Sequence, residues 1–193
     1  MQAKSATLPT HSQTGRAYDE LLVTLVWQGD RRAAERLASR WQPRLLRTAM
    51  RLLGDPLEAQ GAVQDSWVSI WRGLGTLKDP ARFAPWAFGI LQRRCADTIR
   101  GQQRRRRHET GSAAASEPAC QPTSDDTLAI REAFAALSPE QNLAAQLFFV
   151  EGLTLAEIAQ AQGVPIGTAK SRLFHARRHL KAALTNDQTG ETP

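Results

Sequence analysis

The sequence predicts an all-α protein made of two small helical domains joined by a flexible linker. Apolar residues recur at helical spacing through residues 18–107 and again through 127–184, without the strict alternation of a half-buried strand. Residues 108–126, between these stretches, are rich in Ala, Ser and Pro and contain almost no large apolar side chain, a composition typical of a linker. The two ends, residues 1–17 and 185–193, are polar and are expected to be disordered tails.

Glycines delimit the first two expected helices. One helix covers roughly residues 19–27 and ends at Gly29. Asp30 can accept hydrogen bonds from the free amides at the start of a second, longer helix, which Gly54 ends. Pro43 falls inside this second helix. Because proline removes a backbone donor and clashes with the preceding turn, it predicts a kink or a break there.

Two further helices complete the first domain. Asp55 is suited to capping a third helix whose first position is Pro56. Prolines mark residues 78–85 as a loop, and a fourth helix then runs to about residue 107. Cys95 lies on the apolar stripe of this fourth helix, so it is expected to be a small core residue rather than a ligand or a nucleophile.

The second domain contains a helix-turn-helix pattern. A helix begins at Ser138, a short second helix is capped by Thr154, and Gly163 makes the turn into a third helix over residues 165–184. A helix, a short helix, a glycine-containing turn and a longer helix form the arrangement that places its last helix in the major groove of DNA. The sequence therefore predicts a DNA-binding domain at this end of the chain.

The last helix of this domain has one apolar and one basic face. At about 100° per residue, its Ala and Leu residues fall on one side and should face the domain core. The helix carries five Lys or Arg residues and no acid. Its N-terminal part is expected to reach base edges and its later part to bind phosphates, while a histidine between them either touches a base or has no role. The predicted DNA-binding site of this helix consists of Thr168, Lys170, Ser171, Arg172, His175, Arg177, Arg178 and Lys181.

Composition narrows the possible functions. The chain has 25 Lys or Arg against 19 Asp or Glu, a formal net charge of +6, which favours a polyanionic partner. Its two cysteines, Cys95 and Cys120, form no CxxC pair, so neither a disulfide framework nor a zinc finger is expected. No apolar run approaches the roughly 20 residues of a membrane helix, and the polar start does not read as a signal peptide. We therefore expect a cytoplasmic protein.

Several runs of residues point to a known family. Residues 153–159 read Leu-Thr-Leu-Ala-Glu-Ile-Ala, residues 163–173 read Gly-Val-Pro-Ile-Gly-Thr-Ala-Lys-Ser-Arg-Leu, and residues 175–180 read His-Ala-Arg-Arg-His-Leu. These runs closely resemble region four of the sigma-70 family, in its extracytoplasmic-function (ECF) group. The helix from Asp55 to Trp71 resembles region two of the same family, with Gly61 where an acid is usual.

This resemblance implies a sigma factor that binds core RNA polymerase, directs it to promoters and assists promoter opening. The second domain would read the upstream, minus-thirty-five element in duplex DNA. The third helix would dock on the polymerase clamp through Val63, Gln64, Asp65, Val68 and Trp71. The single-stranded minus-ten element would be captured by Lys78, Arg82, Trp86, Arg93, Arg94 and Arg100.

The resemblance also implies regulation. Family members are commonly held inactive by an anti-sigma factor, often one bound to the membrane, which would hold the protein at the inner membrane face. The linker would pass through the polymerase near the RNA exit path. No cofactor, metal, small-molecule substrate or catalytic residue is implied.

Three other functions fit parts of the sequence. A response-regulator transcription factor has a similar Glu-Ile-Ala pattern but requires an α/β receiver domain, and residues 18–107 show no alternating strands. A basic nuclease requires clustered carboxylates or histidines, whereas the four histidines lie in the tails, the linker and the basic helix. An amphipathic membrane-surface protein is possible from the basic helix alone, although its small apolar residues suit packing within a three-helix unit.

Overall fold

The computed structural model describes residues 13–108, 133–134 and 136–186, and within these residues it contains helices and no strand. The first domain comprises α1 (Gln13–Trp27), α2 (Arg31–Leu53), α3 (Pro56–Gly73), the short 3-10 turns η1 (Leu74–Thr76) and η2 (Pro80–Arg82), and α4 (Phe83–His108). The second comprises α6 (Pro139–Phe149), α7 (Leu155–Gln162) and α8 (Ile166–Asn186). Apart from His108, the expected linker lies outside the described residues, as do residues 1–12 and 187–193.

Most helix starts follow from local capping, as the sequence predicts. The Asp30 carboxylate accepts hydrogen bonds from the first amides of α2, and Asp55 accepts one from the Glu58 amide at 2.9 Å in α3. Ser138 and Thr154 each form a reciprocal capping box at the start of α6 and α7. These side chains satisfy donors that a helix leaves unpaired at its first turn, so they fix where each helix begins.

Of the kink or break expected at Pro43, the break is absent. Helix α2 runs as one element from Arg31 to Leu53 with the proline inside it. Trp41 and Leu45, on either side of Pro43, are both 0% exposed, so both halves of the helix are anchored in the same core. Pro43 itself is exposed, on a side where water can hydrogen-bond the carbonyl that loses its partner.

Helix α1 begins earlier than the sequence predicts. A polar tail is expected up to residue 17, yet the helix starts at Gln13. The difference arises from Arg16, whose guanidinium forms an ion pair of 2.9 Å with Glu157 in the second domain. A contact between residues 141 positions apart leaves no trace in the local pattern.

Aromatic packing organises the core of the first domain. The Trp41 ring of α2 meets the Phe83 ring edge-on at a centroid distance of 4.9 Å and the Phe88 ring at 5.6 Å. All three side chains are almost completely buried. Such pairs prefer edge-to-face geometry and hold two helices at a fixed distance. The rings therefore fix how α2 and α4 pack against each other.

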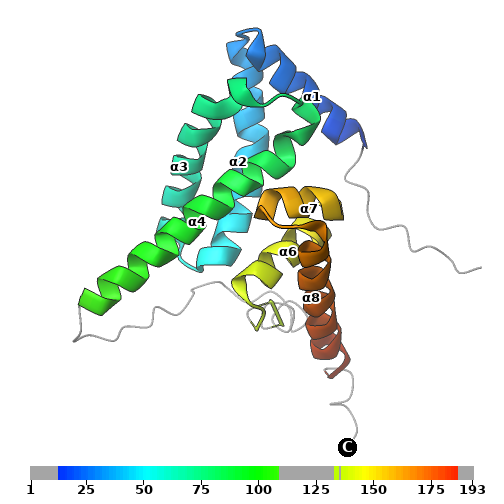
Figure 1. The fold of residues 1–193 in the computed structure, drawn as a ribbon. Coiled ribbons are helices and arrows are strands. Elements are labelled where there is room, and N and C mark those ends of the chain that lie inside the picture. The colour runs from blue at the N-terminus through cyan, green and yellow to red at the C-terminus, as the bar shows by residue number, and fades with distance from the viewer. Residues whose placement is uncertain (1–12, 109–132, 135, 187–193) are drawn as a thin grey trace, which may run out of the picture.

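The two domains share one apolar core. Helix α7 lies across α4 (Figure 1), and Leu147 and Ile158 of the second domain belong to the same buried cluster as Trp41 of the first. Gly89 permits this close crossing, because a Cβ at that position would lie 3.1 Å from the carbonyl oxygen of Ala161. The domains are therefore packed together as one body. None of the described helices combines the length and apolar content that crossing a bilayer requires.

Candidate nucleic-acid and polymerase interfaces

Helix α8 is divided into a buried side and an exposed side, as its sequence predicts. Ala169, Leu173 and Ala176 are at most 5% exposed, and Leu180 is half-buried against the same domain. Six predicted DNA-binding residues lie on the exposed side, namely Thr168, Lys170, Ser171, Arg177, Arg178 and Lys181. Because residues 165–184 contain no acid, all the charged side chains on this exposed side are positive.

The other two predicted residues of α8 are partly buried. The Arg172 guanidinium donates a hydrogen bond of 2.9 Å to Gln162 Oε1, and the Gln162 amide in turn donates one of 2.8 Å to the Glu140 carbonyl. This chain ties α8 to α7 and α6, so Arg172 has a positioning contact that the sequence alone did not reveal. His175 is half-buried, with its ring 5.6 Å from that of Phe174. Phe174 is 61% exposed, an apolar group beside the basic residues that the predicted site omits.

A cavity of about 380 Å³ lies between the end of α3 and the first half of α4. Its lining includes Trp86, Arg93 and Arg94, three of the six residues predicted to capture the minus-ten element. The Trp86 ring lies over Gly73, where a Cβ would be 3.1 Å from the indole. Arg94 donates a hydrogen bond of 2.7 Å to Ser69 Oγ. The cavity thus combines a flat aromatic wall with two cations, of which Arg94 is held by its hydrogen bond to Ser69.

The remaining predicted minus-ten residues lie outside this cavity. Lys78 and Arg82 are exposed on the segment before α4, where Arg82 lies 3.6 Å from Asp79. Arg100 is exposed further along α4 and pairs with Asp97 at 2.5 Å. Asp97 also lines the cavity, together with Ser69, Gly73, Thr76 and Ile90, and the predicted site contains none of these five residues. They come from two helices and a turn, and only the folded chain brings them together.

Helix α3 presents an exposed stripe of mixed polarity. Gln64, Asp65, Val68 and Trp71 are exposed, with Val68 at 44% and Trp71 at 39%. The Trp71 ring stacks on that of Trp67 with the centroids 5.2 Å apart. Four of the five residues that the sequence predicts to contact polymerase are thus exposed to solvent.

Val63 differs from that prediction. Its side chain is 0% exposed and belongs to the core, so it cannot touch a partner in this structure. The reason is its place on the helix. Val63 lies one residue before the exposed Gln64 and faces α2 and α4 with Ala59, Ala62 and Ile70. Leu57 lies two heptads before Trp71, is 78% exposed, and extends the exposed stripe to the start of α3. The residues predicted from the sequence to contact polymerase do not include it.

No group of side chains among the described residues suits metal-dependent catalysis. No three His, Cys, Asp or Glu residues gather there in a way that could hold a metal ion. Cys95 is 2% exposed, and burial raises the pKa of its thiol to about 12. Because the thiolate is the reactive form, this cysteine is inert at neutral pH and acts as the core residue that the sequence predicts.

Comparison with known proteins identifies the family. Residues 37–105 match Sigma-70 region 2 and residues 127–180 match Sigma-70 region 4. The ECF RNA polymerase sigma factor SigM of Mycobacterium tuberculosis is 31% identical over 177 residues, covering 91% of this chain and 88% of the relative. SigL of the same species is 35% identical over 147 residues, covering 72% and 82%. The chain belongs to the ECF sigma factors of the sigma-70 family.

The fold agrees with a solved sigma factor. The sigma factor RpoE of Bartonella quintana, in complex with the anti-sigma factor NepR, has a TM-score of 0.69 and 25% identity, covering 78% of this chain and 96% of that one. An ECF sigma factor is an initiation subunit that binds core RNA polymerase and directs it to promoters, and it is not an enzyme. Region 2 of this sigma factor corresponds to α2–α4, and region 4 includes α6–α8.

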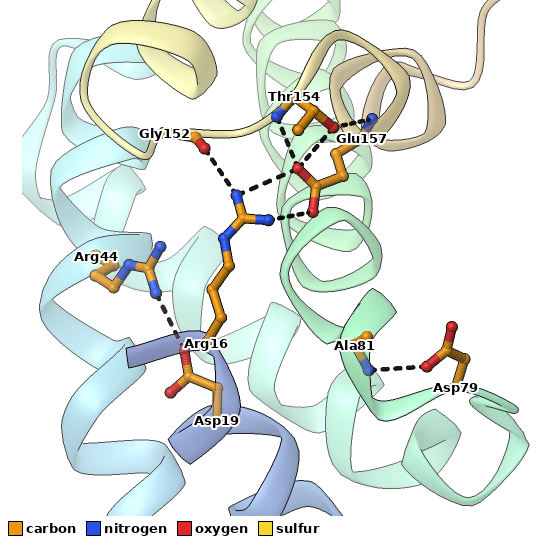
Figure 2. A network of polar contacts seen from close by, with 8 residues as sticks. All are labelled: Arg16, Asp19, Arg44, Asp79, Ala81, Gly152, Thr154 and Glu157. Carbon is orange, nitrogen blue, oxygen red and sulfur yellow. Dashed lines mark hydrogen bonds and ion pairs between the residues drawn. The ribbon is translucent and has the colours of Figure 1, made fainter. Parts of the chain in front are cut away.

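A polar network joins regions 2 and 4 of this sigma factor (Figure 2). Arg44 of α2 contacts Asp19 at 3.6 Å, as Figure 2 shows. Across the domain boundary, the same guanidinium pairs with Glu151 at 2.8 Å. Arg16 of α1 pairs with Glu157 and donates a hydrogen bond of 2.7 Å to the Gly152 carbonyl. The Glu151 side chain is only 1% exposed. The contacts between the domains were not predicted from the sequence, because their partners are more than 100 positions apart.

Proposed function

We propose that this sigma factor acts through three surfaces, one for each step of initiation. The exposed side of α8 binds the upstream promoter element, the α3–α4 cavity receives a base of the minus-ten element, and the α3 stripe docks on the polymerase clamp. The observation that carries this proposal is the division of α8, where Ala169, Leu173 and Ala176 are buried while the basic residues face solvent. A helix fixed in this way can enter a major groove without disturbing its own domain.

On α8, the N-terminal residues suit base readout. Thr168, Lys170 and Ser171 lie in the first turns, where free amides and the helix dipole also attract phosphate. Arg172 reaches the DNA only with the donors left after its bond to Gln162. Arg177, Arg178 and Lys181, one to three turns later, suit phosphate positioning. His175 and the exposed Phe174 complete the face, the latter as an apolar contact for a thymine methyl group.

The cavity beside α4 suits an unstacked base. Extruded bases are held by stacking on aromatic or apolar walls and by hydrogen bonds to their edges. Trp86 and Ile90 supply the walls, while Ser69, Thr76 and Asp97 supply polar groups. Arg93 and Arg94 line the cavity, Lys78, Arg82 and Arg100 are exposed outside it, and these cations attract the phosphates of the strand. This assigns the minus-ten element to the first domain, residues 18–107, and the upstream element to residues 127–184.

The α3 stripe suits a protein partner. Trp71 and Val68 offer apolar area, and Gln64 and Asp65 offer polar contacts beside them, the mixture found in protein interfaces. We assign these four residues to the polymerase clamp and leave Val63 to the core. An anti-sigma factor that covers these surfaces would keep the protein inactive in the cytoplasm, and a membrane-bound one would hold it at the inner membrane face. The complex of Bartonella RpoE with the anti-sigma factor NepR supports a partner of this kind.

One experiment tests the polymerase assignment. Gln64→Ala combined with Asp65→Ala should weaken co-elution with sigma-free core RNA polymerase on gel filtration, with unchanged circular dichroism. The matched control is Gln28→Ala with Glu35→Ala, which removes an exposed amide and an exposed acid from other parts of the first domain. Full co-elution of the Gln64 and Asp65 variant, or equal loss in the control, would contradict the assignment.

A second experiment tests the α8 assignment. Arg172→Ala should weaken binding to duplex DNA that carries the upstream element, because it removes a cation and loosens the link to Gln162. Binding is measured by fluorescence anisotropy across a range of salt concentrations. An affinity equal to that of the unchanged protein at every salt concentration would remove Arg172 from the site.

A further inference from the structure

Helix α2 carries a row of arginines that none of the three proposed surfaces includes. The helix contains seven arginines, no lysine and a single acid, Glu35. Five of these arginines recur at spacings of three or four residues, which places them on one face of the helix, here called the arginine face: Arg36, Arg40, Arg44, Arg47 and Arg51. At a rise of about 1.5 Å per residue, the face extends over about 22 Å.

The arginine face lies away from the core side of α2. Helix α4 packs across α2 (Figure 1), where the Trp41 ring meets that of Phe88. At about 100° per residue, Arg36 and Arg47 lie roughly 120° to 140° around the helix from Trp41, and both are exposed. A partner can therefore reach this face without any change in the packing of the helices.

Two arginines in the middle of the face are neutralised within the protein. Arg40 pairs with Asp19 at 2.6 Å, and Arg44 pairs with Glu151 at 2.8 Å. The side chain of Arg44 is only 17% exposed and lies over the Trp41 ring at 4.0 Å. These contacts hold the centre of the face in place, so Arg40 and Arg44 are structural members of the row.

The other three arginines have no such compensation. Arg36, Arg47 and Arg51 are exposed, and none of them forms an ion pair with another described residue. Partial burial lowers the pKa of the Arg51 guanidinium and the charge of Arg47 lowers it further, although Glu151 opposes the shift. Because arginine stays protonated in proteins, the effect of Arg47 is a cost of holding two cations together. An anion bound between them would remove part of that cost.

The chemistry of the face favours nucleic acid over protein or lipid. None of the exposed large apolar side chains in the described residues belongs to α2. A protein interface has an apolar centre, and a helix that lies on a membrane inserts apolar side chains, so neither partner fits a row of arginines alone. Interfaces with nucleic acid are polar and positively charged, and the guanidinium fork matches the geometry of phosphate. One DNA strand carries a phosphate for about each 3.4 Å of helix axis, so a row of about 22 Å spans about six phosphates.

We propose that the arginine face of α2 binds the phosphate backbone of duplex DNA without reading its sequence. Arg36 and Arg47 contact phosphates, and Arg51 adds to the positive charge beside them. Because phosphates carry no sequence information, the face contributes affinity and not promoter preference, and its contribution weakens steeply as salt rises. The face is a fourth surface, and its DNA contact depends on none of the three assigned above.

The test compares two double variants of the full chain that have the same net charge. Arg36→Gln with Arg47→Gln removes two cations from the face, while Arg51 is kept because of its partial burial. The matched control is Arg31→Gln with Arg72→Gln. Arg31 lies half a turn around α2 from Arg40, Arg72 lies at the end of α3, and both are exposed. Glutamine and arginine have similar helix propensities, so circular dichroism should be unchanged in both variants.

Binding to a short duplex that carries neither promoter element is measured by fluorescence anisotropy across a range of salt concentrations. The face variant should lower the slope of log K against log salt by about 1.8, which corresponds to about 0.9 for each of two phosphate contacts. The control should keep the slope of the unchanged protein. An unchanged slope in the face variant, or an equal decrease in the control, would overturn the proposal.

Other partners of the face would also be detected. Phosphatidylserine vesicles, tested by sedimentation, and core RNA polymerase, tested by co-elution, are offered to the same variants. If the face variant lost binding to either of these while its DNA slope stayed unchanged, the partner would be a lipid surface or a protein, and the proposal would be wrong.

A further combination separates this proposal from the α8 assignment. Arg178→Ala added to the face variant should lower the slope by about 2.7, because contacts on separate surfaces add. A lower slope in the face variant together with no effect of Arg178→Ala would leave the arginine face standing and remove Arg178 from the DNA contact. The reverse result would remove the arginine face and leave the α8 assignment standing.

Discussion

Helices α3 and α8 each carry a candidate interface, but they offer a partner different chemistry. The exposed stripe of α3 includes Val68 and Trp71 at 44% and 39% exposure, with the stacked Trp67 ring beside Trp71. The exposed side of α8 contains cations over its whole length, and residues 165–184 include no acid to neutralise them. Helix α3 can bind a partner by burying its exposed apolar side chains, and α8 can bind one through its positive charge.

This difference determines how each interface should respond to conditions. Apolar contact depends little on ionic strength, whereas binding to phosphates releases counterions and weakens steeply as salt rises. Polymerase docking through α3 should therefore persist at salt concentrations at which duplex binding through α8 is lost.

Trp71→Ala should weaken binding to core RNA polymerase by about 2 kcal/mol, roughly 30-fold, because aromatic residues at the centre of an interface dominate its energy. The measurement is surface plasmon resonance at low and high salt, and the loss should be similar at both. Leu21→Ala, which removes a 52% exposed apolar side chain from α1, is the control and should bind normally. A loss that appears only at low salt would mean that α3 binds through charge.

Arg178→Ala should weaken duplex binding similarly for all sequences and lower the slope of log K against log salt by about 0.9, the value for one phosphate contact. Its side chain is exposed on α8, so the fold should not change. Fluorescence anisotropy with a promoter duplex and a scrambled duplex provides the measurement. An unchanged slope would place Arg178 outside the DNA contact.

Gly61→Glu should stabilise the protein by about 0.5–1 kcal/mol, because glycine weakens a helix interior. No atom lies within 4 Å of a Cβ at this position, so the new side chain has room. It also restores the acid usual in the family beside the α3 stripe, and tighter polymerase binding should follow. Urea unfolding gives the stability, and a lower midpoint than that of the unchanged protein would contradict the open environment of Gly61.

Arg100→Ala should change stability least, by less than about 0.5 kcal/mol, because exposed ion pairs contribute little. Its pair with Asp97 spans 2.5 Å, but the two side chains are 65% and 54% exposed. Any effect should appear in promoter opening, measured by permanganate footprinting. A large loss of stability would show that this exposed ion pair contributes more to the fold than its exposure predicts.

Features that depend on neighbouring residues in the sequence were predicted correctly. The caps at Asp30, Asp55, Ser138 and Thr154 lie within three residues of the amides they satisfy, so their positions could be predicted. The buried side of α8 followed from helical periodicity alone. Cys95 was assigned to the core for the same reason, and it is 2% exposed.

Features that depend on distant partners could not be predicted. Pro43 is kept inside α2 by the burial of Trp41 and Leu45 on either side of it. The Arg44–Glu151 pair joins residues 107 positions apart, and Gly89 has meaning only because α7 crosses α4 there. Neither a cap nor a periodic pattern marks such contacts.

The distribution of indole side chains makes intrinsic fluorescence a selective probe of this molecule. The five tryptophans all lie between residues 27 and 86, and the only tyrosine is Tyr18, so region 4 has no emitter of its own. Trp71 lies on the α3 stripe, Trp86 lines the cavity, and Trp41 is in contact with the Arg44 guanidinium that reaches Glu151. Unlabelled protein can therefore report base capture near Trp86 and changes around Arg44 as changes in emission.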